Sequence, residues 1–259
     1  ELVDEVKALV DLGVVEFTLL GQNVNAYHGT DATGQSHTLA SLINTISEIG
    51  GVERITYSTS HPINMTDDLI KLHGTNQKLM PYLHLPVQSG SDNVLKLMNR
   101  KHTRDYYFGI IEKVRKAKPD IALSSDFIIG FPGETDQDFE DTLDLIRRVK
   151  YMNSYSFKYS PRPGTPAANK ELINYEILDE RLERTQALLN EQQLEYNKQF
   201  IQRTVQVLID GAGKHEGQVK GKSEFNQSVA LQGEKEIIGQ IVPVQIKEAL
   251  THSLLGERA

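Results

Sequence analysis

The 259-residue sequence contains no cysteine and no tryptophan. Without cysteine the chain forms no disulfide, and it offers no thiolate for a nucleophile, a zinc site or an iron–sulfur cluster. It also lacks an apolar run of about 18 to 20 residues, the length that crosses a membrane, and its first residues show no signal-peptide pattern. We therefore expect a cytoplasmic protein with no membrane partner.

The remaining composition is typical of a folded globular chain, with 39% hydrophobic and 24% charged residues. The 28 basic and 35 acidic side chains give a net charge of −7, so the chain as a whole lacks the basic field of a non-specific nucleic-acid binder. The acidic excess lies before residue 201, because basic and acidic side chains balance in residues 201–259. This last segment is the better candidate to face an anionic partner.

Apolar spacing alternates between helical and strand periods from the first residue onward. It predicts five short strands, each preceded by a helix, at 14–20, 52–57, 82–87, 121–129 and 154–159. Ser91, Thr103 and Thr135 lie where helix N-caps are expected. Strands joined through helices pair in parallel. We therefore predict an α/β fold, either a partial parallel (β/α) barrel or an open sheet.

The pattern changes after a long polar helix predicted at about 176–200. Short strands separated by glycines follow, from 205–209 to 241–246, and predict a small antiparallel β-barrel. We place the domain boundary near residue 200, which gives domains of residues 1–199 and 200–259.

The loops after the predicted strands are polar or glycine-rich, whereas the opposite loops are plain turns. Because ligands bind at the carboxyl ends of parallel strands, these loops predict a ligand site. Amides and hydroxyls suit a neutral or zwitterionic ligand better than a hard metal. The loops are 21–23, 58–62, 88–91, 130–134 and 161–165.

Candidate side chains near these loops do not by themselves identify a reaction or a catalytic residue. His84 and Asp126 lie inside strands, so we expect His84 to be structural and Asp126 to have a hydrogen-bonding partner. The other histidines lack metal-ligand spacing, so we predict no metal site, and apart from His61 we expect them at the surface: His28, His37, His73, His102, His215 and His252. A phosphate-binding barrel such as an aldolase remains an alternative, but only Lys158 is a lysine within a strand.

Six sequence strings indicate which protein family the chain resembles. They are GQNVNAY at 21–27, TSHP at 59–62 with TDD at 66–68, HLPVQSGS at 84–91, MNR at 98–100 with HT at 102–103, SSDFIIGFPGET at 124–135, and RPGTPA at 162–167. In this order and spacing they resemble the MiaB-type tRNA methylthiotransferases over nearly the whole chain. The first string favours that branch over the threonylcarbamoyl-adenosine and ribosomal-protein branches, which share the fold.

The resemblance implies a radical S-adenosylmethionine (radical SAM) barrel followed by a TRAM domain, a small RNA-binding β-barrel. The implied enzyme is a transferase that adds a methylthio group to carbon 2 of isopentenyladenosine beside the anticodon of tRNA. Its implied cofactors are S-adenosylmethionine and two 4Fe–4S clusters. Because this chain has no cysteine, we expect a C-terminal fragment that lacks the family's N-terminal domain, the first strand and its cysteine loop, and that is inactive alone.

The resemblance also implies residue roles. Gln22 and Asn23 would meet the methionine amino group, Ser60 and Gln88 the methionine, the ribose or the target base, and Asp126, Ile129 and Gly130 the adenosine. Those implied to contact RNA are His61, Arg162, Lys220, Lys222 and Phe225, the last by stacking on a base.

The TRAM-like string at 221–226 has lysine at 222 where the family has arginine, which keeps the charge but loses the planar fork. The expected partner is the tRNA anticodon stem-loop, and we expect a monomer. A non-catalytic RNA-binding fragment is the alternative.

Overall fold

The computed structural model describes residues 1–31 and 33–259. Seven α-helices lie within these residues: α1 (Leu2–Asp11), α2 (Leu39–Ser47), α3 (Asp67–Thr75), α4 (Asp92–Leu97), α5 (Arg104–Ala117), α6 (Asp136–Val149) and α7 (Tyr175–Lys198). The strands of the first part are β1 (Glu16–Leu19), β2 (His28–Thr30), β3 (Ser36–Thr38), β4 (Arg54–Tyr57), β5 (Tyr82–His84), β6 (Ala122–Ile129) and β7 (Asn153–Lys158).

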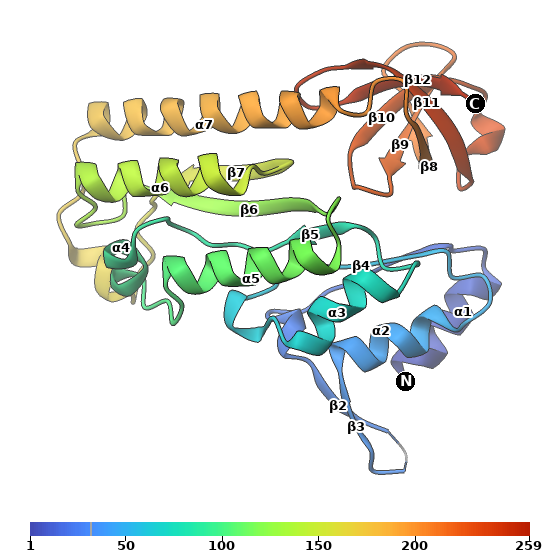
Figure 1. Cartoon of the computed structure of the whole chain (residues 1–259), viewed down its shortest axis with the longest axis horizontal. Coiled ribbons are helices and arrows are strands. Elements are labelled where there is room, and N and C mark those ends of the chain that lie inside the picture. Colours follow the sequence, from blue (N-terminus) through green and yellow to red (C-terminus); the bar gives the residue numbers. More distant parts are fainter. Residues whose placement is uncertain (32) are drawn as a thin grey trace.

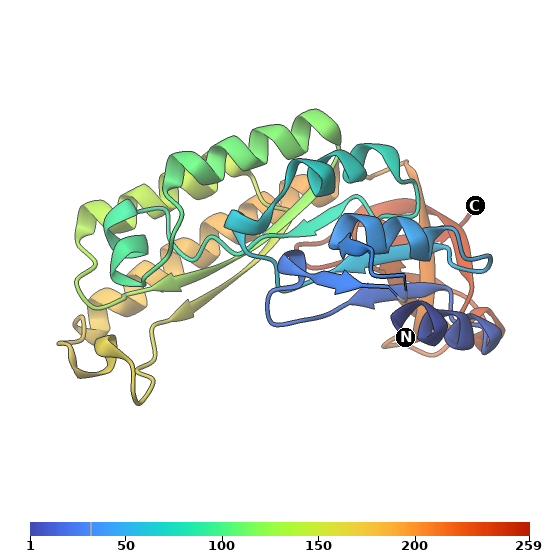
Figure 2. The ribbon, with the colours of Figure 1, turned by 90° about the horizontal axis from the view of Figure 1, so that it is seen from below.

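The five predicted parallel strands are present, divided between two sheets. β1 pairs with β4, and β5, β6 and β7 form a three-stranded sheet in that order, all in parallel. A single parallel bridge between Ile55 and Leu79 joins the two sheets. Helices cover one face of this curved layer, and the other face of β6 and β7 is open (Figures 1 and 2). The strands thus form a partial barrel.

Side-chain caps fix where the helices near the carboxyl ends of the strands begin. Ser91 and Thr103 accept hydrogen bonds from backbone N–H groups in the first turns of α4 and α5. Thr135 and Asp138 form a reciprocal capping box at the start of α6, which satisfies two backbone donors that a helix start otherwise leaves free. The caps predicted at these three positions are confirmed, and they hold the loop ends in place.

The loop after β5 is held against α6 because it contains glycine. A side chain at Gly90 would place its Cβ 2.6 Å from the Cα of Thr142 and 2.5 Å from the Asp141 carbonyl oxygen. The Gly90 N–H instead donates to the Thr142 hydroxyl at 3.0 Å. This close approach positions Gln88, two residues earlier, where it forms an isolated parallel bridge with Phe127 of β6.

A second unit follows α7 and forms a closed barrel in the order β10-β12-β11-β8-β9. Four of its pairings are antiparallel, as predicted, whereas β10 and β12 pair in parallel. Its strands are β8 (Thr204–Ala212), β9 (Gln218–Ser223), β10 (Ser228–Gln232), β11 (Ile241–Ala249) and β12 (Leu254–Arg258).

This barrel packs on the amino-terminal edge of the parallel strands, as Figure 1 shows. Its core includes Ala122 and Met152, which lie at the beginning of β6 and just before β7. Arg54, at the start of β4, donates hydrogen bonds to the carbonyl oxygens of Gln206 at 2.5 Å and Lys222 at 3.1 Å. Side chains and backbone of the two units are therefore joined directly.

The hairpin of β2 and β3 was not predicted, and it projects from the molecule in Figure 1. Each of its strands has three residues and is largely polar, so neither shows the apolar alternation by which strands are recognised. Among the described residues, no helix is long and apolar enough to cross a membrane.

Candidate active site

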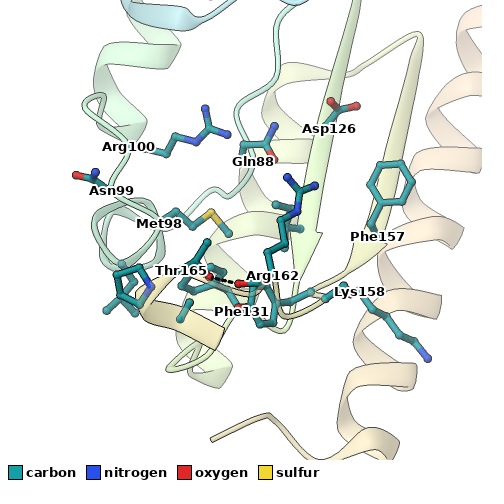
Figure 3. Close-up of a pocket in the computed structure, with 16 residues that line it drawn as sticks. Gln88, Met98, Asn99, Arg100, Asp126, Phe131, Phe157, Lys158, Arg162 and Thr165 are labelled. Atoms are coloured by element: carbon teal, nitrogen blue, oxygen red, sulfur yellow. Dashed lines mark hydrogen bonds between the residues drawn. The ribbon is translucent and has the colours of Figure 1, made fainter. Parts of the chain in front are cut away.

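A cavity of about 940 Å³ opens at the carboxyl ends of β5, β6 and β7 (Figure 3). We call it the rim cavity. Its walls come from β6, β7, the loop after β5, the turn between α4 and α5, and the segment that follows β7. The lining residues are Gln88, Leu97, Met98, Asn99, Arg100, Asp126, Ile128, Phe131, Phe157, Lys158, Tyr159, Ser160, Arg162, Thr165, Pro166 and Ala167.

Three predicted site residues, Gln88, Asp126 and Arg162, line this cavity together. The backbone fixes two of them: the Gln88 N–H donates to the Asp126 carbonyl at 3.0 Å, and the Ile128 N–H donates to the Gln88 carbonyl at 2.9 Å. The Asp126 carboxylate lies 3.5 Å from Nε2 of His84, whose Nδ1 is 3.0 Å from the Ser124 hydroxyl. Asp126 thus has the polar partner expected for it, and His84 is held on both sides.

Arg100 also lines the cavity, and the sequence analysis did not single it out, although it lies in the MNR string. Burial lowers the pKa of its guanidinium, and the negative charge of Asp126 partly offsets this shift. Figure 3 shows the guanidinium groups of Arg100 and Arg162 on either side of Gln88. Within the described chain, neither has a carboxylate oxygen within 4 Å.

Ile129 and Gly130 are placed differently from the expectation that they meet a ligand. The Ile129 side chain is fully buried in the core between strands and helices, and its neighbour Ile128 lines the cavity. Strand alternation explains the difference, because successive side chains point to opposite faces. The Gly130 N–H is already bound by the Glu134 carboxylate at 3.1 and 3.2 Å, so it is not a free donor.

Gly130 also has a structural reason to be glycine. Its φ of +76° is a conformation that other residues rarely adopt. An added Cβ would lie 2.3 Å from Cδ1 of Leu178 on α7. The tight turn into the Glu134 loop therefore depends on this residue whether or not a ligand is bound.

The first two loops, which carry Gln22, Asn23, Ser60 and His61, do not line the rim cavity. They are tied to each other, since Asn23 donates to the Asn64 side chain at 2.9 Å. Asn25 exchanges two hydrogen bonds of 2.9 Å with the backbone of His61. The five loops therefore form two groups, one around the cavity and one beside β1 and β4.

His61 and His102 connect these two groups. Their rings meet edge to face with centroids 5.6 Å apart. Burial is the main cause that lowers the pKa of both rings, and the charge of Arg100 lowers it further. Burial lowers the pKa of His102 to about 4. His102 and His73 are buried, so the prediction that they are surface residues is wrong.

Two buried polar side chains beside this contact have no hydrogen-bond partner in residues 1–31 and 33–259. They are the Ser60 hydroxyl and both ring nitrogens of His102, although the Val87 carbonyl lies close enough to His102 to favour its protonated form slightly. An unsatisfied buried polar atom costs free energy. Such atoms at the end of a strand layer are available to a bound ligand.

Of the three residues expected to contact RNA in the second barrel, Lys220 is exposed and Lys222 donates to the Ser228 hydroxyl at 2.9 Å. Phe225 is a correction: its ring is 5% exposed and packs against Phe200 with centroids 5.1 Å apart. It fills the junction between α7 and the barrel, because that junction needs apolar volume. It cannot stack on a base without unpacking.

Comparison with known proteins agrees with the two-part architecture. Residues 1–146 match the family model described as the Radical SAM superfamily, and residues 198–258 match that of the TRAM domain. The tRNA-2-methylthio-N(6)-dimethylallyladenosine synthases of Rickettsia felis and Rickettsia canadensis are 56% and 53% identical to this chain over 255 residues.

These alignments cover 98% of this chain and 57% of each relative, so the chain spans little more than half the length of the curated relatives it matches. Among solved structures, the radical S-adenosylmethionine methyltransferase TsrM from Kitasatospora setae is 14% identical. That match covers 64% of this chain and 32% of TsrM, with a TM-score of 0.49.

Proposed function

Because the chain belongs to the Radical SAM superfamily, we propose that it forms the S-adenosylmethionine pocket and the RNA-contacting surfaces of a tRNA methylthiotransferase. The proposed reaction of the full-length protein adds a methylthio group to carbon 2 of isopentenyladenosine beside the anticodon. The observation that carries this proposal is the 56% identity, along 98% of the chain, to the tRNA-2-methylthio-N(6)-dimethylallyladenosine synthase of Rickettsia felis.

The side chains of the strand ends fit S-adenosylmethionine, a zwitterionic sulfonium with a neutral nucleoside. Asp126 and Gln88 offer a carboxylate and an amide on one cavity wall, which suits ribose hydroxyls and the adenine amino group. Ile128 offers an apolar surface to the adenine, and the unpartnered Ser60 hydroxyl is available to the amino-acid end. We assign Gln22 and Asn23 to that end as well, and Ile129 with Gly130 to shaping the turn under the adenosine.

When bound and reduced, S-adenosylmethionine supplies a 5′-deoxyadenosyl radical. This chain does not fit the cluster that would reduce it. It has no cysteine, and its described residues contain no group of three or more His, Asp or Glu placed to hold a metal. The cluster ligands must therefore come from protein outside these residues, and the chain's own contribution is to bind, orient and enclose.

We divide the work between two domains, residues 1–199 for the cofactor and target base and residues 200–259 for RNA. Lys220 and Lys222 lie two residues apart on β9, so their side chains point to the same face of the barrel. They supply positive charge to phosphates. His61 and Arg162 contact the RNA near the strand ends.

The test uses the full-length gene product, reconstituted with its clusters, and tRNA that carries isopentenyladenosine. We expect the methylthio nucleoside in a digest of the tRNA, and tRNA with threonylcarbamoyl-adenosine to remain unmodified. Asp126→Asn, which keeps the size of the side chain, should lower the rate through weaker cofactor binding. An unmodified prenylated nucleoside after reconstitution would contradict the proposal.

RNA binding without catalysis by the 259-residue chain is the second candidate, and the absence of cysteine favours it. Filter binding of an anticodon stem-loop at several salt concentrations tests it. We expect Lys220→Gln with Lys222→Gln to reduce the salt slope by about 2, since each phosphate contact contributes about 1. An unchanged slope would remove these lysines from the interface.

A further inference from the structure

We infer that residues 221–226 of the second barrel hold β4 and β5 at a fixed angle, through contacts with Arg54 and Tyr82, and so position the two groups of loops that form the cofactor site. We call these residues the junction string. The inference rests on the proposed function, because it takes S-adenosylmethionine as the ligand that contacts both groups. It gives a string that resembles an RNA-binding motif a role in the first domain.

The seam between the two parallel sheets has few backbone hydrogen bonds. The Ile55 N–H donates to the Lys78 carbonyl at 2.7 Å, and the Met80 N–H donates to the Ile55 carbonyl at 2.9 Å. These two bonds form the bridge between β4 and the segment that leads into β5. Among residues 1–31 and 33–259, no other backbone hydrogen bond joins the strands of the two sheets. Beyond Ile55, toward the carboxyl ends, side-chain packing alone therefore holds these strands together.

The proposed cofactor must contact both sides of this seam. Ser60 follows β4 and is assigned to the amino-acid end of the ligand. Gln88 and Asp126 belong to the other sheet and are assigned to the nucleoside. The groups that bind one ligand must be held within about 0.5 Å of their productive positions. Contacts that fix the angle between the sheets therefore also set the affinity for the cofactor.

Arg54 ties the first sheet to the second barrel. It is 5% exposed and lies at the start of β4, one residue before the bridge. Its guanidinium donates to the carbonyl oxygens of Lys222, in the junction string, and of Gln206 on β8. It also lies 3.5 Å from the Glu16 carboxylate on β1. One planar guanidinium group therefore connects β1 and β4 to β8 and β9.

The other end of the junction string reaches the second sheet. Tyr82, at the start of β5, packs on the core of the second barrel. Burial raises the pKa of its phenol, and polar contacts with Ser124 and Asn226 partly offset this shift. Asn226 has a φ of +65°, which asparagine adopts more readily than most residues. The string thus contacts both sides of the seam, at the end where the bridge lies.

Other residues of the junction string are engaged inside the protein. Gly221 leaves no room for a side chain, because an added Cβ would lie 2.0 Å from the Leu208 carbonyl oxygen. Glu224 donates its N–H to the Gln206 carbonyl at 3.2 Å, and its carboxylate accepts from the Gln206 N–H at 2.9 Å. These contacts hold the string in the position from which it meets Arg54 and Tyr82.

The first test measures the distance between the carboxyl ends of the two sheets in the 259-residue chain. Because the chain has no cysteine, spin labels attach only at introduced ones. Leu20 follows β1 and is 73% exposed, and Lys101 is exposed between α4 and α5. Leu20→Cys and Lys101→Cys thus place one label on each side of the seam. Arg54→Lys keeps the charge and lacks the planar fork, so we expect a longer and broader distance distribution.

Asn226→Gly tests the other end of the string with little risk to folding, because glycine adopts a positive φ readily. It removes the side chain that contacts Tyr82, and we expect a smaller shift of the distance distribution in the same direction. An unchanged distribution in Asn226→Gly and in Arg54→Lys would overturn the inference.

Gln227→Ala is the matched control, at the same junction but on the side of α7. The Gln227 side chain bonds to Ser223 and to Asn197 of α7. Its loss should lower stability, and we expect the distance between the labels to stay as in the unaltered chain. If Gln227→Ala and Arg54→Lys broaden the distribution equally, lost stability explains the effect and the inference is wrong.

The second test separates the cofactor from RNA. In the full-length protein reconstituted with its clusters, we expect Arg54→Lys to weaken S-adenosylmethionine binding about tenfold in equilibrium dialysis. Its affinity for an anticodon stem-loop should stay within about twofold. Lys220→Gln with Lys222→Gln should show the reverse pattern. Weaker RNA binding with unchanged cofactor binding in Arg54→Lys would assign the junction to RNA alone and overturn the inference.

Failure of this inference is distinguishable from failure of the proposed function. If the unaltered full-length protein makes the methylthio nucleoside, and Arg54→Lys changes neither the label distance nor the cofactor affinity, the function stands and the inference does not. If both depend on Arg54 but no methylthio nucleoside forms, the inference stands and the reaction does not.

Discussion

The two ends of the parallel strands treat arginine in opposite ways. At the amino-terminal edge, Arg54 is buried and bound by two carbonyl oxygens of the second barrel. At the carboxyl edge, Arg100 and Arg162 line a cavity, and neither forms an ion pair within the described chain. Arg54 therefore joins the two units, whereas the half-buried Arg100 and the exposed Arg162 are available to a ligand.

Neutral polar groups follow the same division. At the barrel junction, Gln227 donates to the Asn197 side chain at 2.9 Å, and Asn197 donates to the Leu250 carbonyl at 2.8 Å. Near the carboxyl edge, Ser60, His102 and Tyr159 all have buried polar atoms without a partner among the described residues. The polar groups named at the barrel junction therefore serve stability, whereas these three at the carboxyl edge are available to a ligand.

The largest expected effect is on the support beneath the cavity. Arg181 is buried against Glu134 at 2.7 Å, and Glu134 holds the Gly130 turn. Arg181→Met should lower the free energy of unfolding by about 3 to 5 kcal/mol, because it leaves a buried carboxylate without its cation. Urea unfolding of this variant beside the unaltered chain measures the change.

The same variant has a defined pH dependence. Burial raises the pKa of Glu134, and Arg181 opposes the shift. Without Arg181, the Glu134 carboxyl group therefore holds its proton more tightly in the folded variant than in the unfolded chain. Its stability is greatest below the ordinary carboxyl pKa and falls as pH rises through the raised one. Adding Glu134→Gln should abolish that fall, and an unchanged pH profile would show that the carboxylate is not the cause.

The next effect tests the amino-terminal edge. Arg54→Met removes charged hydrogen bonds to Gln206 and Lys222 and should cost about 2 to 3 kcal/mol. We also expect faster proteolysis near residue 202, where α7 meets the barrel. Stability equal to that of the unaltered chain would mean that apolar packing alone joins the two units.

A smaller effect is expected from His102 and depends on acid. Its folded pKa of about 4 lies below the ordinary 6.5, so its neutral form is favoured by folding. The stability linked to this ring is complete above pH 6.5 and is lost as pH falls toward 4. His102→Phe should therefore unfold less readily between pH 6.5 and 4 than the unaltered chain.

His73→Phe is the comparison for that experiment. Its pKa is also about 4, but its Nε2 lies 2.7 Å from the Tyr57 hydroxyl. Replacing it leaves that hydroxyl without a partner, so His73→Phe should lose stability at neutral pH as well. If both variants behave alike at pH 7, the absence of a partner at His102 is not what distinguishes the two.

The smallest expected loss of stability is that of an Arg162 variant, and it directly tests the difference between the arginines of the two edges. Arg162→Gln should change the free energy of unfolding by no more than about 0.5 kcal/mol, because the exposed Arg162 guanidinium makes no ion pair with any residue that the structure describes. Thermal unfolding of Arg162→Gln and Arg54→Met in the same buffer gives the contrast. Equal losses would mean that Arg162, which lines the rim cavity, contributes to stability as Arg181 does beneath it.

Much of this architecture could be predicted from the sequence, because it is encoded locally. The parallel strands and the caps at Ser91, Thr103 and Thr135 follow from short-range spacing and hydrogen bonding. Placing Gln88 and Asp126 at one edge followed from strand direction. These features need no knowledge of which distant segments meet.

The remainder depends on long-range packing. Phe225 was expected at the surface and instead fills the space beside Phe200, and nothing near residue 225 in the sequence indicates that α7 ends there. Ile129 and Ile128 cannot be assigned to a face until the register with β5 and β7 is known. Arg100 and Phe157 lie far apart along the chain and become one site only in the fold.

The distance between the rim cavity and the second barrel limits which nucleic acids can contact both. β6 runs from the barrel junction to the cavity in eight residues, and at about 3.3 Å per residue this is roughly 26 Å. A nucleic acid that reaches both the rim cavity and the second barrel must therefore extend along much of β6, beyond the reach of a single nucleotide.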